Sequence, residues 1–158
     1  MRLLKYLIIV AIVSISSVAF AAGTITFATY GPGVRGGKGG VQIVATCTAD
    51  ASDASYPIKV LPTDMTGMYL NQVRVKFGGT APTANSDLEI LEHSSTGYDI
   101  LNGAGSNLVD AVTNSDFQAT INSVPSSVYV YGDLYIKITN NAVNSALTTI
   151  ILDFIQLD

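Results

Sequence analysis

The chain contains no tryptophan, one cysteine and one histidine among its 158 residues, and only 13% of the residues are charged. A single cysteine excludes an internal disulfide. A single histidine leaves few ways to build a Ser-His-Asp arrangement, and no G-x-S-x-G turn accompanies it. Eight basic residues stand against twelve acidic ones. This balance disfavours nucleic-acid binding, which depends on clustered lysine and arginine.

The candidates for reactive or metal-binding groups are few. His93 and Glu89 together supply at most two ligands, fewer than a zinc site uses. We interpret His93 as an exposed residue at a strand end. Asp50 and Asp53 lie in TADASDAS, whose spacing does not match a calcium-binding EF-hand loop and favours a solvated turn. We therefore assign no catalytic, cofactor-binding or metal-ligating residues.

The N-terminus has the pattern of a secretory leader. Arg2 and Lys5 precede an apolar stretch, and small residues at 19 and 21 suit a signal peptidase. We expect cleavage after Ala21, which leaves residues 22–158, export from the cytoplasm and no stable membrane anchor. Cleavage takes the eight basic residues to six, against twelve acidic ones, so the net charge falls from −4 to −6.

Glycine is concentrated in GPGVRGGKGG, residues 31–40. A nucleotide-binding P-loop reads G-x-x-x-x-G-K-[ST], and Pro32 and Gly39 occupy positions that need glycine and a hydroxyl residue. The segment that follows is β-like, so no helix N-terminus faces an anion. We interpret the run as a connector or arm whose tip carries Arg35 and Lys38, suited to contact with an acidic neighbour.

Short runs of β-branched and aromatic residues, separated by turn residues, replace any long helical periodicity. About eight or nine such strands predict an all-β fold, a single β-sandwich of jelly-roll type covering residues 22–158. The expected strands are Thr24–Tyr30, Val41–Thr48, Pro57–Leu61, Met68–Phe77, Leu88–Glu92, Tyr98–Leu101, Val128–Tyr131, Leu134–Thr139 and Leu147–Leu157. Asn107–Gln118 is ambiguous between loop, helical turn and strand.

Two features bear on the core. Cys47 shares the parity of Ile43 and Ala45, which predicts a small buried hydrophobe; an intermolecular disulfide or a reactive thiol is the alternative. The strand Leu147–Leu157 is long and very apolar. It is most easily explained as a central strand covered on both faces, or as an edge that another subunit completes.

A candidate contact surface comes from aromatic residues. Tyr129 and Tyr131 share one face of VYVY, and Tyr135 is a possible neighbour. Such side chains are enriched at interfaces when exposed, and they are ordinary sandwich residues when half buried. Phe154 on the terminal strand completes the aromatic candidates, beside Arg35 and Lys38 of the glycine-rich run.

Roughly half of the chain, from Gly78 to Leu152, carries turn motifs in a familiar order. They are GGTAPTANSDLEIL, GYDILNGAGSN and GDLYIKITNNAVNSALTTIIL. In this order they resemble a family of small, uncharacterised or virion-associated proteins of tailed phages and prophages. The motifs are turn chemistry, with Asn102-Gly103 suited to positive φ and Asn140 and Asn141 suited to a hairpin end. The resemblance implies a fold and brings no catalytic residues with it.

The sequence thus predicts a non-catalytic structural or decoration-type subunit of a phage-like particle or extracellular assembly, with other subunits or its own copies as partners. The secretory leader departs from the phage pattern and points to periplasmic or surface display. The alternative is a secreted surface binding module, an adhesin that recognises a glycan or a protein. No nucleic acid is expected as a partner.

Overall fold

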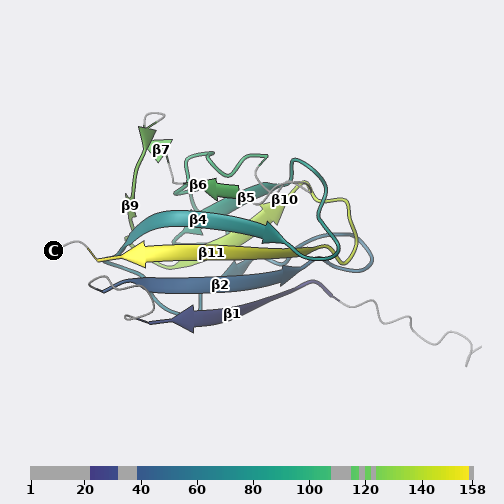
Figure 1. Ribbon diagram of the computed structural model, residues 1–158, viewed down its shortest axis with the longest axis horizontal. Helices are drawn as coiled ribbons and strands as arrows, with labels where there is room; N and C mark the ends of the chain where they lie inside the picture. The colour runs from purple at the N-terminus through teal and green to yellow at the C-terminus, as the bar shows by residue number, and fades with distance from the viewer. Residues whose placement is uncertain (1–21, 32–38, 108–114, 118–119, 122–123, 157–158) are drawn as a thin grey trace, which may run out of the picture.

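A computed structural model describes residues 22–31, 39–107, 115–117, 120–121 and 124–156 of the chain. The predicted leader, together with Arg35 and Lys38, lies outside these described residues. The described chain is all-β, with two antiparallel sheets packed as a small β-sandwich (Figure 1). The predicted fold class is confirmed, and the jelly-roll variant stays a prediction. None of the described segments forms a helix long and apolar enough to cross a bilayer.

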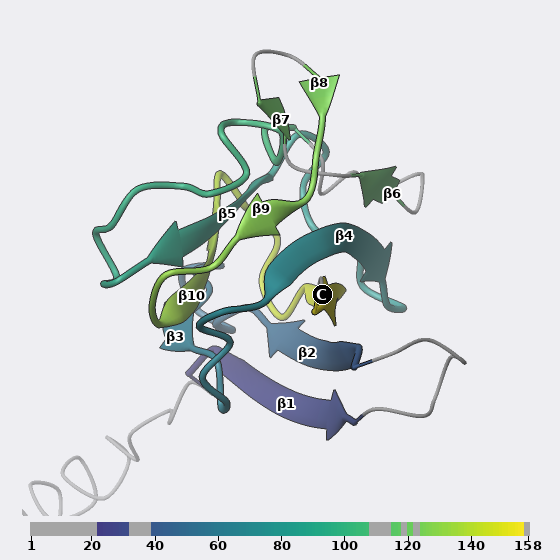
Figure 2. The same cartoon turned by 90° about the vertical axis from the view of Figure 1, so that its left-hand side faces the viewer.

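The larger sheet contains the strands at both ends of the described chain. Its order is β1 (Thr24–Tyr30), β2 (Val41–Thr48), β11 (Leu147–Ile155) and β4 (Tyr69–Phe77), with β6 (Ser115–Phe117) and β9 (Val128–Tyr129) both pairing with β4. The smaller sheet has the order β3 (Lys59–Val60), β10 (Leu134–Thr139) and β5 (Asp87–Glu92). A short hairpin pairs β7 (Thr120–Ile121) with β8 (Val124–Pro125). Figure 2 shows β1 and β3 on the same side of the sandwich.

Period-two alternation explains why these segments are strands and which faces they bury. In β4, Val73 and Val75 are 0% exposed, while Arg74 and Lys76 face outward. In β10 the buried positions alternate in the same way, because successive side chains of a strand point to opposite faces. The two inner faces meet in one hydrophobic cluster, which supplies most of the folding free energy.

The terminal strand β11 is central, between β2 and β4, as the sequence predicted. Its inner face is buried, and Leu152 and Phe154 are 0% and 1% exposed. The predicted cover on both faces is wrong for the outer face, which is only partly buried and carries a polar ladder instead of a second layer. Asp153 accepts hydrogen bonds from Gln42 Nε2 (2.6 Å) and Arg74 Nη2 (2.7 Å) across three neighbouring strands.

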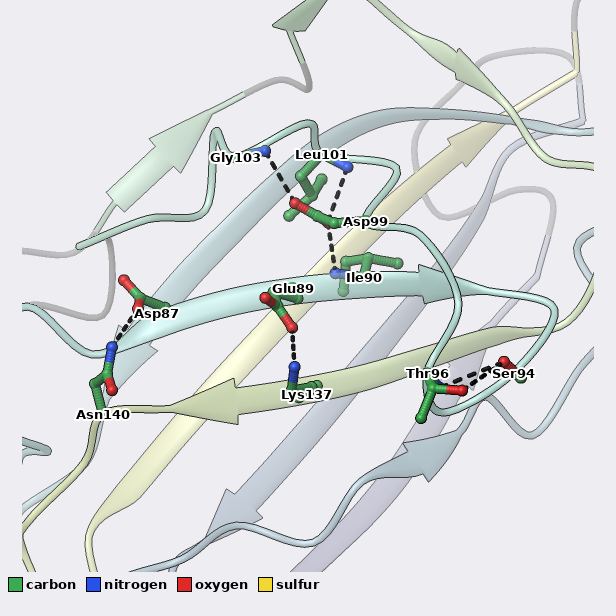
Figure 3. Close-up of polar contacts among 10 residues, drawn as sticks. All are labelled: Asp87, Glu89, Ile90, Ser94, Thr96, Asp99, Leu101, Gly103, Lys137 and Asn140. Carbon is green, nitrogen blue, oxygen red and sulfur yellow. Dashed lines mark hydrogen bonds and ion pairs between the residues drawn. The ribbon is translucent and has the colours of Figure 1, made fainter.

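The predicted strand Tyr98–Leu101 is wrong. Residues 99–107 form successive turns, with one isolated bridge between Asp99 and Leu91. The Asp99 carboxylate holds the turns, because Oδ1 accepts from the amides of Ile90 (3.1 Å) and Leu101 (3.0 Å), as Figure 3 shows. Aspartate side chains favour such turns by competing with strand pairing for backbone amides.

The same segment covers the outer edge of β5. Backbone hydrogen bonds run from Glu92 N to Tyr98 O (3.1 Å), from Ile100 N to Ile90 O (2.9 Å), and from Leu88 N to Gly105 O (2.9 Å). The approach at Gly105 requires glycine, since a Cβ there would lie 1.8 Å from the carbonyl oxygen of Leu88. Residues 98–105 therefore protect an edge that would otherwise be open.

The turns behind the phage-like resemblance interlock at one end of the sandwich. Asn141 Oδ1 accepts from Thr83 N (3.0 Å), and the Thr83 hydroxyl oxygen accepts from Ala142 N (2.7 Å). Asn102 and Gly103 adopt positive φ, 51° and 77°, as their sequence predicted. These motifs are structural contacts between turns.

Candidate contact surface: tyrosines held by a buried glutamate

Three tyrosine rings form a row at the opposite end of the molecule. Tyr69 begins β4, Tyr129 ends β9, and Tyr131 follows two residues later. Ring centroids lie 5.1 Å apart for Tyr69 and Tyr129 and 4.6 Å apart for Tyr129 and Tyr131, both edge-to-face. Pairing of β9 with the first residues of β4 sets this geometry, since Tyr69 lies opposite Tyr129. Edge-to-face packing is a favoured arrangement for aromatic pairs.

Beside this row lies a charged side chain inside the protein. Glu92, the last residue of β5, is 0% exposed. It shares the inward parity of Leu88 and Ile90, so β-strand alternation carries its carboxylate into the sandwich. A buried carboxylate is costly unless hydrogen bonds satisfy it.

Both oxygens of Glu92 have partners from separate loops. Oε1 accepts from the backbone amide of Tyr131 (2.6 Å), and Oε2 accepts from the hydroxyl of Tyr98 in a short hydrogen bond. The carboxylate therefore fixes two tyrosines that lie 6 and 39 residues away in sequence. This hydrogen bond, with some burial, raises the pKa of Tyr98 to about 12.

The tyrosines fixed by Glu92 are also the most exposed large hydrophobic residues described. Tyr131 is 66% exposed and Tyr98 is 57% exposed. We call Tyr69, Tyr98, Tyr129 and Tyr131 the tyrosine surface. Tyr98 and Tyr131 are exposed, and Tyr69 and Tyr129 are half buried. Hydrogen bonds and ring contacts hold their positions, so the side chains lose little conformational freedom on binding a partner.

His93 lies next to the tyrosine surface, at the strand end where the sequence placed it. Its side chain is 60% exposed, and its Nε2 lies 3.7 Å from Oε2 of Glu92. Its ring centroid is 6.5 Å from that of Tyr98. Its backbone has positive φ (69°) and donates to Asp133 O (2.8 Å), so that the chain turns sharply after β5. Glu92 and His93 here position a surface through hydrogen bonds and packing.

The aromatic residues predicted as contact residues occupy different positions in the structure. Tyr129 and Tyr131 are neighbours as predicted; Tyr129 is half buried and Tyr131 is exposed. Tyr135 is not beside them, because it lies on the outer face of the smaller sheet, opposite Val60 and Leu91. Phe154 is 1% exposed in a central strand, so it is a core residue and not a contact residue.

Cys47 is buried, with the predicted parity. It is 0% exposed together with Ile43 and Ala45, and burial raises the pKa of its thiol to about 12. A thiol with so little thiolate and no exposure is a poor nucleophile. Within the described ranges, no three histidine, cysteine, aspartate or glutamate side chains gather closely enough to hold a metal ion.

A groove of about 300 Å³ lies along β10, away from the tyrosine surface, and Ile58, Ile138 and Asn141 are among its lining residues. Its charged side chains already have partners. Lys137 Nζ lies 2.5 Å from Glu89 Oε2, and Asp53 accepts from Ser55 N (2.9 Å). Figure 3 shows the ion pair Lys137–Glu89 across the two strands. The groove offers amide and apolar groups in preference to charge.

Comparison with models of protein families, with curated proteins and with solved structures found no match to this chain.

Proposed function

We propose that this protein is a non-catalytic subunit that acts by association, as a structural or decoration-type component of a phage-like particle or an extracellular assembly. The observation that carries the proposal is the Glu92 carboxylate, which holds the exposed Tyr98 and Tyr131 in fixed positions. Burying a charged group costs desolvation free energy, and the effect of the buried Glu92 is to hold two exposed aromatic rings in place.

Tyrosine suits such a role because its ring supplies a large apolar contact area and its hydroxyl a hydrogen bond at the rim. Tyrosines are enriched among the residues that dominate binding energy at protein interfaces. The phage-like order of turns supports the particle assignment, and the leader pattern supports export. No catalytic residue, cofactor, nucleic acid or stable membrane anchor is part of this proposal.

The test compares two tyrosine variants. We expect the double variant Tyr98→Ser/Tyr131→Ser to lose self-association or partner recovery, measured by size exclusion with light scattering and by pull-down. The matched control is Tyr135→Ser, which removes a tyrosine from the outer face of the smaller sheet. A wild-type protein that stays monomeric at high concentration and recovers no partner would contradict the proposal.

The exposed rings also support a second candidate, a secreted binding module that recognises a glycan. Sugar rings stack their apolar faces on aromatic side chains, and Tyr131 is 66% exposed. A glycan array decides between the two. Specific binding that Tyr131→Ser abolishes and Tyr135→Ser preserves would favour the binding module, and a blank array would remove it.

A further inference from the structure

The sheet edges of the described chain are covered or are only two or three residues long, with one exception. The outer edge of β4 pairs with β6 and β9, residues 98–105 cover β5, and β3 is only two residues long. Strand β1 spans seven residues and pairs only with β2 in the described part of the chain. Figure 1 shows β1 at the margin of the larger sheet. Natural proteins usually blunt an edge of this length with charge, proline or a covering segment.

The direction of the free backbone groups of β1 follows from one contact. Lys59 Nζ donates to the carbonyl oxygen of Ile25 (2.8 Å) from the neighbouring edge, so this carbonyl points away from β2. Backbone groups in an antiparallel strand alternate between its two sides. Those of Phe27 and Thr29 therefore also point away from β2 and are available for a further strand.

The chemistry of β1 suits a second copy of itself. Its sequence, TITFATY, has no charged residue and no proline. Thr26, Ala28, Thr29 and Tyr30 are exposed. The whole chain has a net charge of −4, so two copies repel each other over much of their surface. Because β1 itself contains no charged residue, and the one charged group bonded to its edge is the cation Lys59, two acidic chains can meet there without bringing carboxylates together.

We propose that two copies of this chain pair through β1, antiparallel, with Ala28 of each copy on the twofold axis. In this register Phe27 exchanges both backbone hydrogen bonds with the partner's Thr29, and the symmetric pair does the same. The partner's Gly31, which then lies opposite Ile25, follows the last residue of β1, so the ladder can end at the Phe27–Thr29 pairs and leave the Ile25 carbonyl to Lys59. A register centred on Phe27 would instead place the partner's Thr29 in competition with Lys59.

The small side chain of Ala28 fits this position. Ala28 forms a non-hydrogen-bonded pair with its own copy, where Cα atoms of opposite residues lie about 4.5 Å apart and side chains are closest. The larger sheet then continues across the axis into the second copy. This interface is separate from the tyrosine surface.

A cysteine placed on the axis tests the register directly. We expect Ala28→Cys to form a disulfide-linked dimer under mild oxidation, seen on a non-reducing gel, since Cα atoms about 4.5 Å apart can be bridged. The matched control is Thr26→Cys, whose partner copy lies four residues, about 13 Å, along the strand. The wild-type protein is the blank, because its single cysteine, Cys47, is buried and should not cross-link. Equal cross-linking of both variants, or none in either, would overturn the register.

A charge on the axis tests the interface itself. We expect light scattering to show a dimer for the wild-type protein and a monomer for Ala28→Lys, with a dimer fraction at least about tenfold lower. The matched control, Thr46→Lys, puts the same charge on an exposed position of β2 beside Thr26 and should leave the dimer intact. Circular dichroism confirms that both variants fold.

Two results would refute the β1 interface. One is a wild-type monomer at the highest soluble concentration. The other is a dimer that Ala28→Lys leaves unchanged; if Tyr98→Ser/Tyr131→Ser then dissociates it, association through the tyrosine surface stands and the β1 inference fails.

Discussion

At the scale of single residues, Glu92 is the residue with the widest consequences. It is fully buried, and its two oxygens join the loop that contains Tyr98 to the loop that contains Tyr131. Removing one partner of a buried charged hydrogen bond usually costs about 1–3 kcal/mol, since the other group is left unsatisfied. The tyrosine surface thus depends on the Glu92 carboxylate, which is buried and cannot contact a partner.

The contact between Glu92 and Tyr98 predicts a pH dependence. The pKa of Tyr98, about 12, lies above the ordinary value of 10.0 because the neutral hydroxyl donates to the carboxylate. The contribution to stability is therefore complete below pH 10 and is lost as the pH rises towards 12. Ultraviolet titration should show Tyr98 ionising late, as should the buried Tyr56, and Glu92→Gln should lower the pKa of Tyr98 towards 10.

Tyr98→Phe is the control for this assignment, since it should remove one late-titrating group and leave the buried Tyr56, whose pKa burial also raises. A late phase of the titration whose amplitude Tyr98→Phe leaves unchanged would mean that Tyr98 does not carry the shift.

The signal for Glu92 was present in the sequence, in the parity of LEILE, where Leu88, Ile90 and Glu92 alternate with outward residues. Its partners could not be predicted, because Tyr131 is 39 residues away and only the packing of two loops brings them together. The prediction that Tyr135 neighbours Tyr131 was wrong for the same reason. The two residues are near in sequence, but Tyr135 projects from the smaller sheet.

At the scale of elements, alternation predicted the strands that are half buried, and β1, β2 and β10 have the predicted bounds. It failed for residues 98–101, where apolar residues resemble a strand but Asp99 captures backbone amides. Hydrophobic periodicity does not reveal a side chain that competes with strand pairing for backbone amides. The buried face of β11 was predicted, and its polar outer ladder was not.

The cover over β5 yields a prediction for one glycine. A Cβ on residue 105 would lie 1.8 Å from the Leu88 carbonyl, so Gly105→Ala should push the segment off the edge and destabilise the fold by about 2 kcal/mol. Chemical unfolding measures the change in the free energy of unfolding. Gly79→Ala, where a Cβ meets nothing within 4 Å, should be within about 0.5 kcal/mol of the wild type. Equal effects of the two substitutions would mean that residues 98–105 do not lie against β5 as described.

At the scale of the whole molecule, net charge and edge chemistry oppose each other. Each chain has a net charge of −4, while the proposed β1 interface contains no charged residue of its own strand. Salt shortens the screening length from about 30 Å at 0.01 M to about 8 Å at 0.15 M. Raising the ionic strength over this range should therefore strengthen the dimer, because it weakens repulsion and removes no ion pair from the interface.

Sedimentation equilibrium at both salt concentrations measures this dependence. A dimer that weakens with salt would point to ion pairs across the interface and away from β1. The wild-type protein at the two salt concentrations serves as its own control. Thr46→Lys makes the net charge less negative, so it should narrow the difference in dimer stability between the two conditions.

The direction of β1 has a geometric corollary. The strand runs towards the end of the sandwich that carries Tyr69 and Tyr129, as Figure 1 shows. Antiparallel pairing about Ala28 would therefore point the two aromatic ends in opposite directions. Such a particle is divalent: it bridges two targets on opposite sides, and two copies on one flat target could not both engage it.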